Sequence, residues 1–202
     1  MILVRHGETT GESSIRYHGR GDVALSELGR AQMRAACTAI ERLDGGMKFA
    51  RVFSSPLSRA SEGARIVAGE SAEIFAIEEF AEVHFGLFEG LTAEEIRERY
   101  PREFARFSTD RLSADYAYPG GESRADFTRR VRRGVAKMLE LWPHDSTCAG
   151  TAVVVAHRGT IRQIVEYLAG ERPIVELGSI QIMRFDGKWR TVALDVTEHL
   201  IK

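Results

Sequence analysis

The decapeptide TAVVVAHRGT at residues 151–160 decides the fold class of this chain. Its three consecutive valines are apolar without alternation, which is typical of a strand covered on both faces in a parallel sheet. The strand is followed at once by His157 and Arg158, and then by a glycine from which a helical pattern starts. The stretch therefore predicts a buried strand, a polar junction and a helix in direct succession.

Other short runs rich in β-branched or aromatic residues extend this strand pattern. They predict strands at residues 2–4, 49–53 and 74–77, and a hairpin around the Asp186-Gly187 turn, with arms at 180–185 and 189–194. Strands that alternate with helical patterns indicate a βαβ sheet with helices on both faces. We expect a three-layer α/β/α fold with a mostly parallel sheet, as one domain over residues 1–202.

Capping residues mark where the expected helices begin. Ser26 precedes an apolar pattern that runs from Leu28 to Leu43, and Thr92 with Glu95 forms a capping box. Ser123 with Asp126 opens another helix, which runs until Pro143, and a further helix follows Gly159. Residues 82–118 are rich in charge and poor in strand patterns, so we interpret them as a helical insertion over one end of the sheet.

Composition limits the classes of function. The 202 residues are 44% hydrophobic and 28% charged, which is ordinary for a globular chain and excludes a coiled coil, a collagen or a disulfide scaffold. A net charge of −1 provides no general attraction for nucleic acid or an anionic membrane. The apolar runs are too short for a signal peptide or a membrane span, and Cys37 and Cys148 fit no disulfide framework. We expect a cytoplasmic protein with reduced thiols.

Polar residues follow three of the expected strands. Arg5 and His6 follow the first strand, Ser54 to Arg59 follow the second, and His157 and Arg158 follow the valine-rich one. Ligands bind beyond the carboxyl ends of strands in open parallel sheets. Arginine matches phosphate oxygens, and a histidine with a free ring nitrogen can attack phosphorus. The convergence predicts phosphate chemistry.

Two other interpretations compete with this one. Each residue taken singly is compatible with a surface arginine or a structural histidine. Six histidines also raise the question of a metal-dependent hydrolase, but no HExxH motif is present, and His18, His84, His144 and His199 lack ligand spacing. We therefore expect no metal site.

Several motifs together make the chain resemble the histidine phosphatase superfamily, the phosphoglycerate mutase-like fold, over nearly its whole length. The segment LVRHGET at residues 3–9 is similar to the first histidine motif of that family, and AHRG at 156–159 to the second. Further resemblances are GRGDVALSELG at residues 19–29, SSPLSRA at 54–60, EVHFGLFEG at 82–90 and PGGES at 119–123.

The resemblance implies a two-step phosphoryl transfer without metal or organic cofactor. In it, His6 attacks phosphorus and becomes phosphohistidine, while Arg5, Arg59 and His157 hold the transferred group. Glu82 protonates the leaving oxygen and then accepts a proton from water. The implied partner is a small-molecule phosphate ester, and homodimer formation stays open.

Departures from the family pattern bear on the substrate. Glu12 stands where the family often has asparagine, His18 where it often has glutamine, Ala24 in place of a proline and Arg158 in place of a glycine. The resemblance therefore transfers no role to Glu12, Arg16 or His18, and Arg158 adds a charge near the mouth of the site.

Within the family the main choice is between phosphatase and mutase. The chain ends soon after residues 197–200 and lacks the longer insertion and tail of cofactor-dependent mutases, so we favour a phosphatase. Residues 127–131 and the short ending most resemble α-ribazole phosphatases and broad-specificity relatives, which suggests α-ribazole 5'-phosphate as one substrate. Mutase-type transfer and a non-catalytic module that binds phosphate ligands are the alternatives.

Overall fold

A six-stranded mixed sheet forms the centre of the computed structural model, which describes residues 1–44, 49–142 and 150–200. The strand order is β3-β2-β4-β1-β5-β6. The strands are β1 (Ile2–Arg5), β2 (Arg51–Ser54), β3 (Ile74–Ala76), β4 (Ala152–Ala156), β5 (Ile180–Phe185) and β6 (Trp189–Val196). The first four are mutually parallel, β5 pairs antiparallel with β1, and β6 pairs antiparallel with β5 at one edge of the sheet. The predicted α/β fold with a mostly parallel sheet is confirmed.

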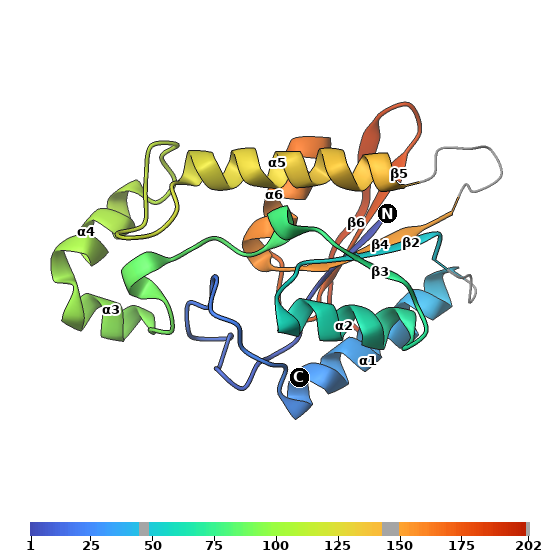
Figure 1. Cartoon of the computed structure of the whole chain (residues 1–202), viewed down its shortest axis with the longest axis horizontal. Helices are drawn as coiled ribbons and strands as arrows, with labels where there is room; N and C mark the ends of the chain where they lie inside the picture. The colour runs from blue at the N-terminus through green and yellow to red at the C-terminus, as the bar shows by residue number, and fades with distance from the viewer. Residues whose placement is uncertain (45–48, 143–149, 201–202) are drawn as a thin grey trace.

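The described residues form six α-helices, of which α1, α2, α5 and α6 flank this sheet (Figure 1). They are α1 (Glu27–Asp44), α2 (Ser58–Ala68), α3 (Ala93–Arg99), α4 (Pro101–Asp110), α5 (Arg124–Leu141) and α6 (Arg158–Ala169). Apolar residues of α5 and α6 form one buried core against the sheet, and those of α1 and α2 form the other. Figure 1 shows the two pairs on opposite sides of the strands, so the fold has three layers.

The valine-rich stretch behaves as its pattern predicts. All five residues of β4 are buried, and the strand lies between β1 and β2 at the centre of the sheet. In register, Arg5 of β1 pairs with Ala156 of β4, and Ser54 of β2 pairs with Val155. The residues that follow the three strands therefore emerge side by side at one edge.

The capping predictions are confirmed by hydrogen bonds. The Thr92 hydroxyl accepts from the Glu95 amide at 3.2 Å while the Glu95 carboxylate accepts from the Thr92 amide at 3.0 Å. The Ser123 hydroxyl accepts from the Asp126 amide at 3.0 Å. These bonds satisfy backbone donors that the first turn of a helix leaves free.

Two expectations need correction. Leu28 does not face the core: it is 55% exposed, because the buried face of α1 is formed by Met33, Ala36 and Ile40 instead. The insertion at residues 82–118 is α-helical only in α3 and α4, while the rest is loop with one short 3-10 helix at Gly86–Phe88. Helix α2 is an element that the sequence analysis did not anticipate.

Aromatic packing holds the insertion together. Phe88, Ile96, Phe107 and Tyr116 are buried against one another in a core separate from those of the sheet. This small core carries α3 and α4 at the left end of Figure 1, beside the loop that follows β1.

Three residues considered in the sequence analysis, Pro143, His144 and Cys148, lie outside the described residues, whereas Cys37 is a free thiol. In the part of the chain that the structure describes, no helix is both long and apolar enough to cross a bilayer.

Candidate active site

The two predicted histidines meet where β1 and β4 end. His6 follows β1 and its backbone amide donates to the Ala156 carbonyl at 3.0 Å, which brings it beside His157. The two rings lie with their centroids 5.1 Å apart and their planes at 64°. Both residues are buried. Parallel pairing of two central strands thus places two imidazoles in edge contact.

Hydrogen bonding fixes the tautomer of His6. Its Nδ1 lies 2.7 Å from the Gly7 carbonyl oxygen. A carbonyl can only accept, so Nδ1 carries the proton and donates it, and Nε2 keeps a free lone pair. Burial, followed by the nearby Arg5 and Arg59 cations, holds the pKa of His6 well below its ordinary value. His6 is therefore a neutral imidazole near pH 7 with one ring nitrogen available for attack.

His157 is held by a residue to which the sequence analysis gave no separate role. Its Nε2 and the Ser55 hydroxyl form a hydrogen bond of 2.7 Å, while its Nδ1 is buried with no protein partner among the described residues. Burial, then Arg59 and His6, also hold the pKa of His157 well below its ordinary value. Ser55 follows β2 directly, so its position at a strand end was the signal that could have identified it.

The two predicted arginines differ in what holds them. The Arg5 guanidinium donates through Nη1 to the Val175 carbonyl at 3.1 Å, and burial followed by the nearby Arg158 lowers the pKa of Arg5 to about 9. Arg59, fully buried, donates to the carbonyls of Gly19 and Gly21 at 2.8 Å each. Within the described chain, the Nε atom of each arginine is buried without a partner. Each therefore retains an unused donor at the site.

Glu82 is fixed by two backbone amides. Its carboxylate accepts from the Val83 amide and from the Gly159 amide, both at 2.9 Å. Glycine in the first turn of α6 leaves room for the second bond, because a Cβ at position 159 would lie 2.4 Å from the Glu82 Oε1 atom and the carboxylate would have to shift. The close approach of α6 thus positions Glu82, the one carboxylate among the described residues that line the cavity.

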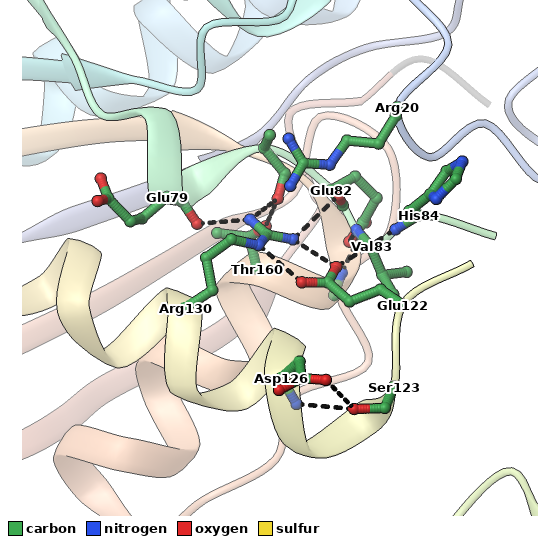
Figure 2. A network of polar contacts seen from close by, with 12 residues as sticks. Arg20, Glu79, Glu82, Val83, His84, Glu122, Ser123, Asp126, Arg130 and Thr160 are labelled. Atoms are coloured by element: carbon green, nitrogen blue, oxygen red, sulfur yellow. Dashed lines mark hydrogen bonds and ion pairs between the residues drawn. The ribbon is translucent and has the colours of Figure 1, made fainter. Parts of the chain in front are cut away.

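The backbone around Glu82 is held by Arg130 of α5 (Figure 2). Its guanidinium pairs with both carboxylate oxygens of Glu122, at 2.9 and 2.7 Å. It also donates to the carbonyls of Glu79 and Ala81 at 2.8 Å and of Glu82 at 3.3 Å. A half-buried ion pair of this kind anchors the segment that presents Glu82.

A cavity of about 550 Å³ opens above these groups. Arg5, His6 and Glu82 line it, whereas Arg59 and His157 do not and lie buried beside them. All five predicted residues are thus brought to one place. The cavity wall also carries cations that the sequence analysis did not assign to the site: Arg16, Arg111, Arg124, Arg162 and Arg172. Tyr17, Phe85, Phe107, Tyr116, Tyr118 and Phe127 complete much of the apolar lining.

The loop that departs from the family pattern is rebuilt around ion pairs. Glu12 has a positive φ of 60°, and its carboxylate pairs with Arg16 at 3.1 Å instead of facing the cavity. Arg16 also pairs with Glu95 of α3 at 2.6 Å. His18 lines the cavity, and its Nε2 donates to the Gly11 carbonyl. The acid at position 12 therefore does not oppose an anionic ligand directly.

Residues suited to hold a metal are not gathered at this site. Across residues 1–44, 49–142 and 150–200, no group of three or more His, Cys, Asp or Glu side chains is placed to bind one ion. The charge near the cavity floor comes from guanidinium groups, which match the oxygens of a phosphoryl group.

Comparison with known proteins identifies relatives along the whole chain. The family model described as histidine phosphatase superfamily (branch 1) matches residues 1–195. Phosphoglycerate mutase-like protein 4 of Arabidopsis thaliana is 31% identical over 207 residues, covering 99% of this chain and 86% of the relative. The chain spans about half the length of several curated mycobacterial relatives that it matches.

Solved structures agree with the fold. The mycobacterial glucosyl-3-phosphoglycerate phosphatase superposes with a TM-score of 0.78 at 28% identity, over 96% of this chain and 97% of that one. A putative α-ribazole-5'-P phosphatase from Escherichia coli gives a TM-score of 0.80 at 24% identity, over 96% and 95% of the two chains. The second likeness supports the fold alone, since its identity is low.

Proposed function

The chain belongs to the histidine phosphatase superfamily, branch 1, and from that premise we propose that it is a metal-independent phosphatase. It would hydrolyse small-molecule phosphate monoesters through a phosphohistidine intermediate. The observation that carries the proposal is the state of His6: a buried, neutral imidazole whose Nδ1 is occupied by the Gly7 carbonyl and whose Nε2 is free. That is the form of histidine that can attack phosphorus without first losing a proton.

In the first step, His6 Nε2 forms a bond to phosphorus and the bond from phosphorus to the ester oxygen breaks. Glu82 donates its proton to the leaving oxygen, so that an alcohol departs. In the second step, water loses a proton to Glu82 and its oxygen attacks the phosphorus. As that bond forms, the bond between phosphorus and His6 Nε2 breaks and inorganic phosphate leaves, so that His6 and Glu82 return to their starting forms.

Arg5, Arg59 and His157 would bind the phosphoryl oxygens during both steps. The unused Nε donors of the two arginines and the free Nδ1 of His157 are the groups available for this. Preorganised cations in a buried site stabilise developing negative charge more strongly than they would in water. They perform the task that magnesium performs in kinases, so the reaction requires no cofactor.

We further propose that the protein acts in the cytoplasm, with a small phosphate ester as its partner and no role for nucleic acid or a membrane. Homodimer formation stays open. Among known substrates in the family, α-ribazole 5'-phosphate remains one candidate. The name of the Arabidopsis relative keeps a mutase in view as the second candidate function.

The test is phosphate release from a panel of phosphate monoesters, with p-nitrophenyl phosphate included, by the wild type and by His6→Ala. We expect release of inorganic phosphate by the wild type alone. Transfer of the phosphoryl group to a second alcohol, without release of phosphate, would indicate a mutase. Tight binding of esters with no turnover would indicate a binding module.

A further inference from the structure

One wall of the cavity carries three arginines that the proposed reaction does not use. Arg158 and Arg162 lie one turn apart on α6, Arg172 follows the end of that helix, and all three line the cavity. None of them forms an ion pair with a carboxylate within the part of the chain that the structure describes. We call these three residues the arginine wall.

The arginine wall is anchored by three consecutive carbonyl groups. Arg162 donates to the carbonyls of Pro173 and Ile174 at 2.9 and 2.7 Å. The Val175 carbonyl accepts from Arg158 Nε at 3.3 Å and also from Arg5 Nη1 at 3.1 Å. Arg158 therefore bonds the same oxygen atom as the arginine that is proposed to hold the reacting phosphoryl group.

The loop that offers these carbonyls is strained. Val175 has a φ of 61°, which a β-branched residue rarely adopts and which is a strained conformation for it. Asp195 holds it there by accepting from the amides of Ile174 and Val175 at 2.8 and 2.7 Å. With the amides bound to Asp195, the carbonyls are turned towards the guanidinium groups. Strain of this kind persists where a structure enforces a particular geometry.

The anchoring leaves the positive charges close together. Burial, followed by Arg158 and Arg172, lowers the pKa of Arg162, and Arg158 is the first charge after burial that lowers the pKa of Arg5. Two acids, Asp195 and then Glu82, act in the opposite direction on the pKa of Arg162. The Asp195 oxygens already accept from the loop amides and from Gln181, and the Glu82 oxygens accept from the Val83 and Gly159 amides. The hydrogen-bond acceptors of Arg158 and Arg162 are thus neutral carbonyls, and an anion bound in the cavity would relieve the repulsion among these cations.

We propose that the arginine wall binds a second anionic group of the substrate, a carboxylate or a second phosphate close to the ester that is cleaved. This deepens the proposed function and rests on it. Because Arg158 and Arg5 share one acceptor atom, the second anion would lie near the reacting phosphoryl group. The substrate class is therefore a compact phosphate monoester with an additional acidic group, in preference to a phosphate on a neutral body.

The experiment compares matched pairs of esters that differ only in the second group. Phosphoglycolate and 2-hydroxyethyl phosphate differ by a carboxylate in place of a hydroxymethyl group. Propane-1,3-diol bisphosphate and 3-hydroxypropyl phosphate differ by a second phosphate, after correction for the two equivalent ends of the bisphosphate. The pair in which the wild type more strongly prefers the charged ester identifies whether the site binds a carboxylate or a second phosphate.

Three variants carry the same change of charge. Arg158→Gln removes the cation next to Arg5. Arg172→Gln removes a cation whose side chain makes no hydrogen bond to the Val175 loop in the part of the chain that the structure describes. Arg34→Gln changes an exposed arginine of α1 outside the cavity and serves as the control. We expect Arg158→Gln to lower kcat/KM for the charged ester by about 10- to 100-fold, as loss of a charge-assisted hydrogen bond implies. The neutral ester should change by less than about twofold, since no such bond is lost.

Equal losses on the charged and neutral esters in Arg158→Gln would overturn the proposal, because they would place its effect on the reacting group or on Arg5. A wild type that hydrolyses both members of each pair equally would overturn it too, while leaving the phosphatase intact. If the wild type hydrolyses none of these esters and does not hydrolyse p-nitrophenyl phosphate, the proposed function fails. In that case, calorimetry would still test the anion site independently of turnover, by comparing the binding of phosphoglycolate and 2-hydroxyethyl phosphate to the wild type and to Arg158→Gln.

Discussion

Arginine side chains occur in two settings in this cavity: at its floor, beside the proposed nucleophile, and in the arginine wall. What we call the floor comprises Arg5, His6 and Glu82, which line the cavity, and Arg59 and His157, which lie beside them. All five are buried; the Ser55 hydroxyl holds His157, and backbone groups hold the other four. In the arginine wall, Arg158 and Arg172 are exposed and Arg162 is half-buried. The difference suggests that the floor fixes the reaction, which needs rigid geometry, whereas the wall selects the ester, which needs charge at an open mouth.

The floor should be far more sensitive to substitution than the wall. His6→Ala removes the proposed nucleophile, so we expect turnover of every ester to fall by roughly 10⁴-fold or more. Steady-state phosphate release measures this. His84→Ala is the matched control, since its ring lies outside the cavity, and it should keep activity close to that of the wild type. A His6→Ala enzyme with a rate near that of the wild type would contradict the proposal that the floor carries out the reaction.

Glu82→Gln should give the next largest effect, and one that depends on the leaving group. An alkyl alcohol needs a proton as it departs, whereas nitrophenolate needs little help. We expect alkyl phosphate hydrolysis to fall by roughly 10²- to 10⁴-fold, with a smaller loss for p-nitrophenyl phosphate. Pre-steady-state rates of the phosphorylation step provide the measurement.

Glu89, seven residues after Glu82, is the other candidate for the general acid. Glu89 accepts from the amides of Gly19, Arg20 and Phe85, which indicates a role in holding two loops together. Glu89→Gln should therefore slow both esters alike. A larger loss on the alkyl ester from Glu89→Gln than from Glu82→Gln would transfer the acid role.

Arg130→Gln tests whether the activity of Glu82 depends on the hydrogen bonds that hold the backbone around it. The guanidinium of Arg130 binds the carbonyls around Glu82, so its loss should let that carboxylate shift and reduce alkyl phosphate turnover by roughly tenfold. If Arg130 positions Glu82, the ratio of alkyl to nitrophenyl turnover falls, as it does in Glu82→Gln. A purely structural role would lower both rates together and leave that ratio unchanged.

Burial of the floor histidines should appear in stability as a function of pH. The pKa values of His6 and His157 are held well below 6.5 in the folded chain, so below that pH the unfolded chain binds protons that the folded chain excludes. The free energy of unfolding should fall as the pH drops below 6.5, by up to about 1.4 kcal/mol per pH unit for each histidine. Above pH 6.5 these groups contribute no pH dependence.

Urea unfolding at several pH values checks this, with His6→Gln as the comparison. The variant has one fewer histidine that burial keeps neutral, so its free energy of unfolding should fall less between pH 6.5 and 5.5 than that of the wild type. Identical slopes for the two proteins would contradict a neutral, buried His6.

The smallest effect concerns metal. In the proposed reaction the arginines of the floor stabilise the charge on the phosphoryl group, so exhaustive chelation with EDTA should leave the rate unchanged. Activity lost on chelation and restored by a divalent cation would instead favour a metal-dependent reaction.

The floor was largely predictable from sequence because strand ends are local features. The valine run at residues 153–155 identified a central strand, and the residues after each strand had to meet at one edge. Glu82 was selected by its motif alone. Its hydrogen bond from the Gly159 amide depends on how closely α6 approaches, which no local pattern predicts. Ser55 was quoted only within a motif, since its bond to His157 joins residues distant in sequence.

The wall was less predictable for a physical reason. Arg158 attracted notice because it follows His157, but Arg162 and Arg172 resemble ordinary helix-surface cations in the sequence. Their gathering depends on a loop that Asp195 holds in a strained conformation, and no local pattern announces a positive φ at valine. Leu28 shows the same limit, since its apolar spacing favoured burial and the packing of α1 left it exposed.

Trapping of the intermediate tests the account most directly. Wild-type enzyme mixed with ³²P-labelled ester and quenched within its first turnover should carry phosphate that is stable in base and labile in acid, on a peptide that contains His6. His6→Ala should carry none. Label that is found on another residue, or turnover by the wild type with no labelled protein at any quench time, would contradict the proposal that His6 is the nucleophile.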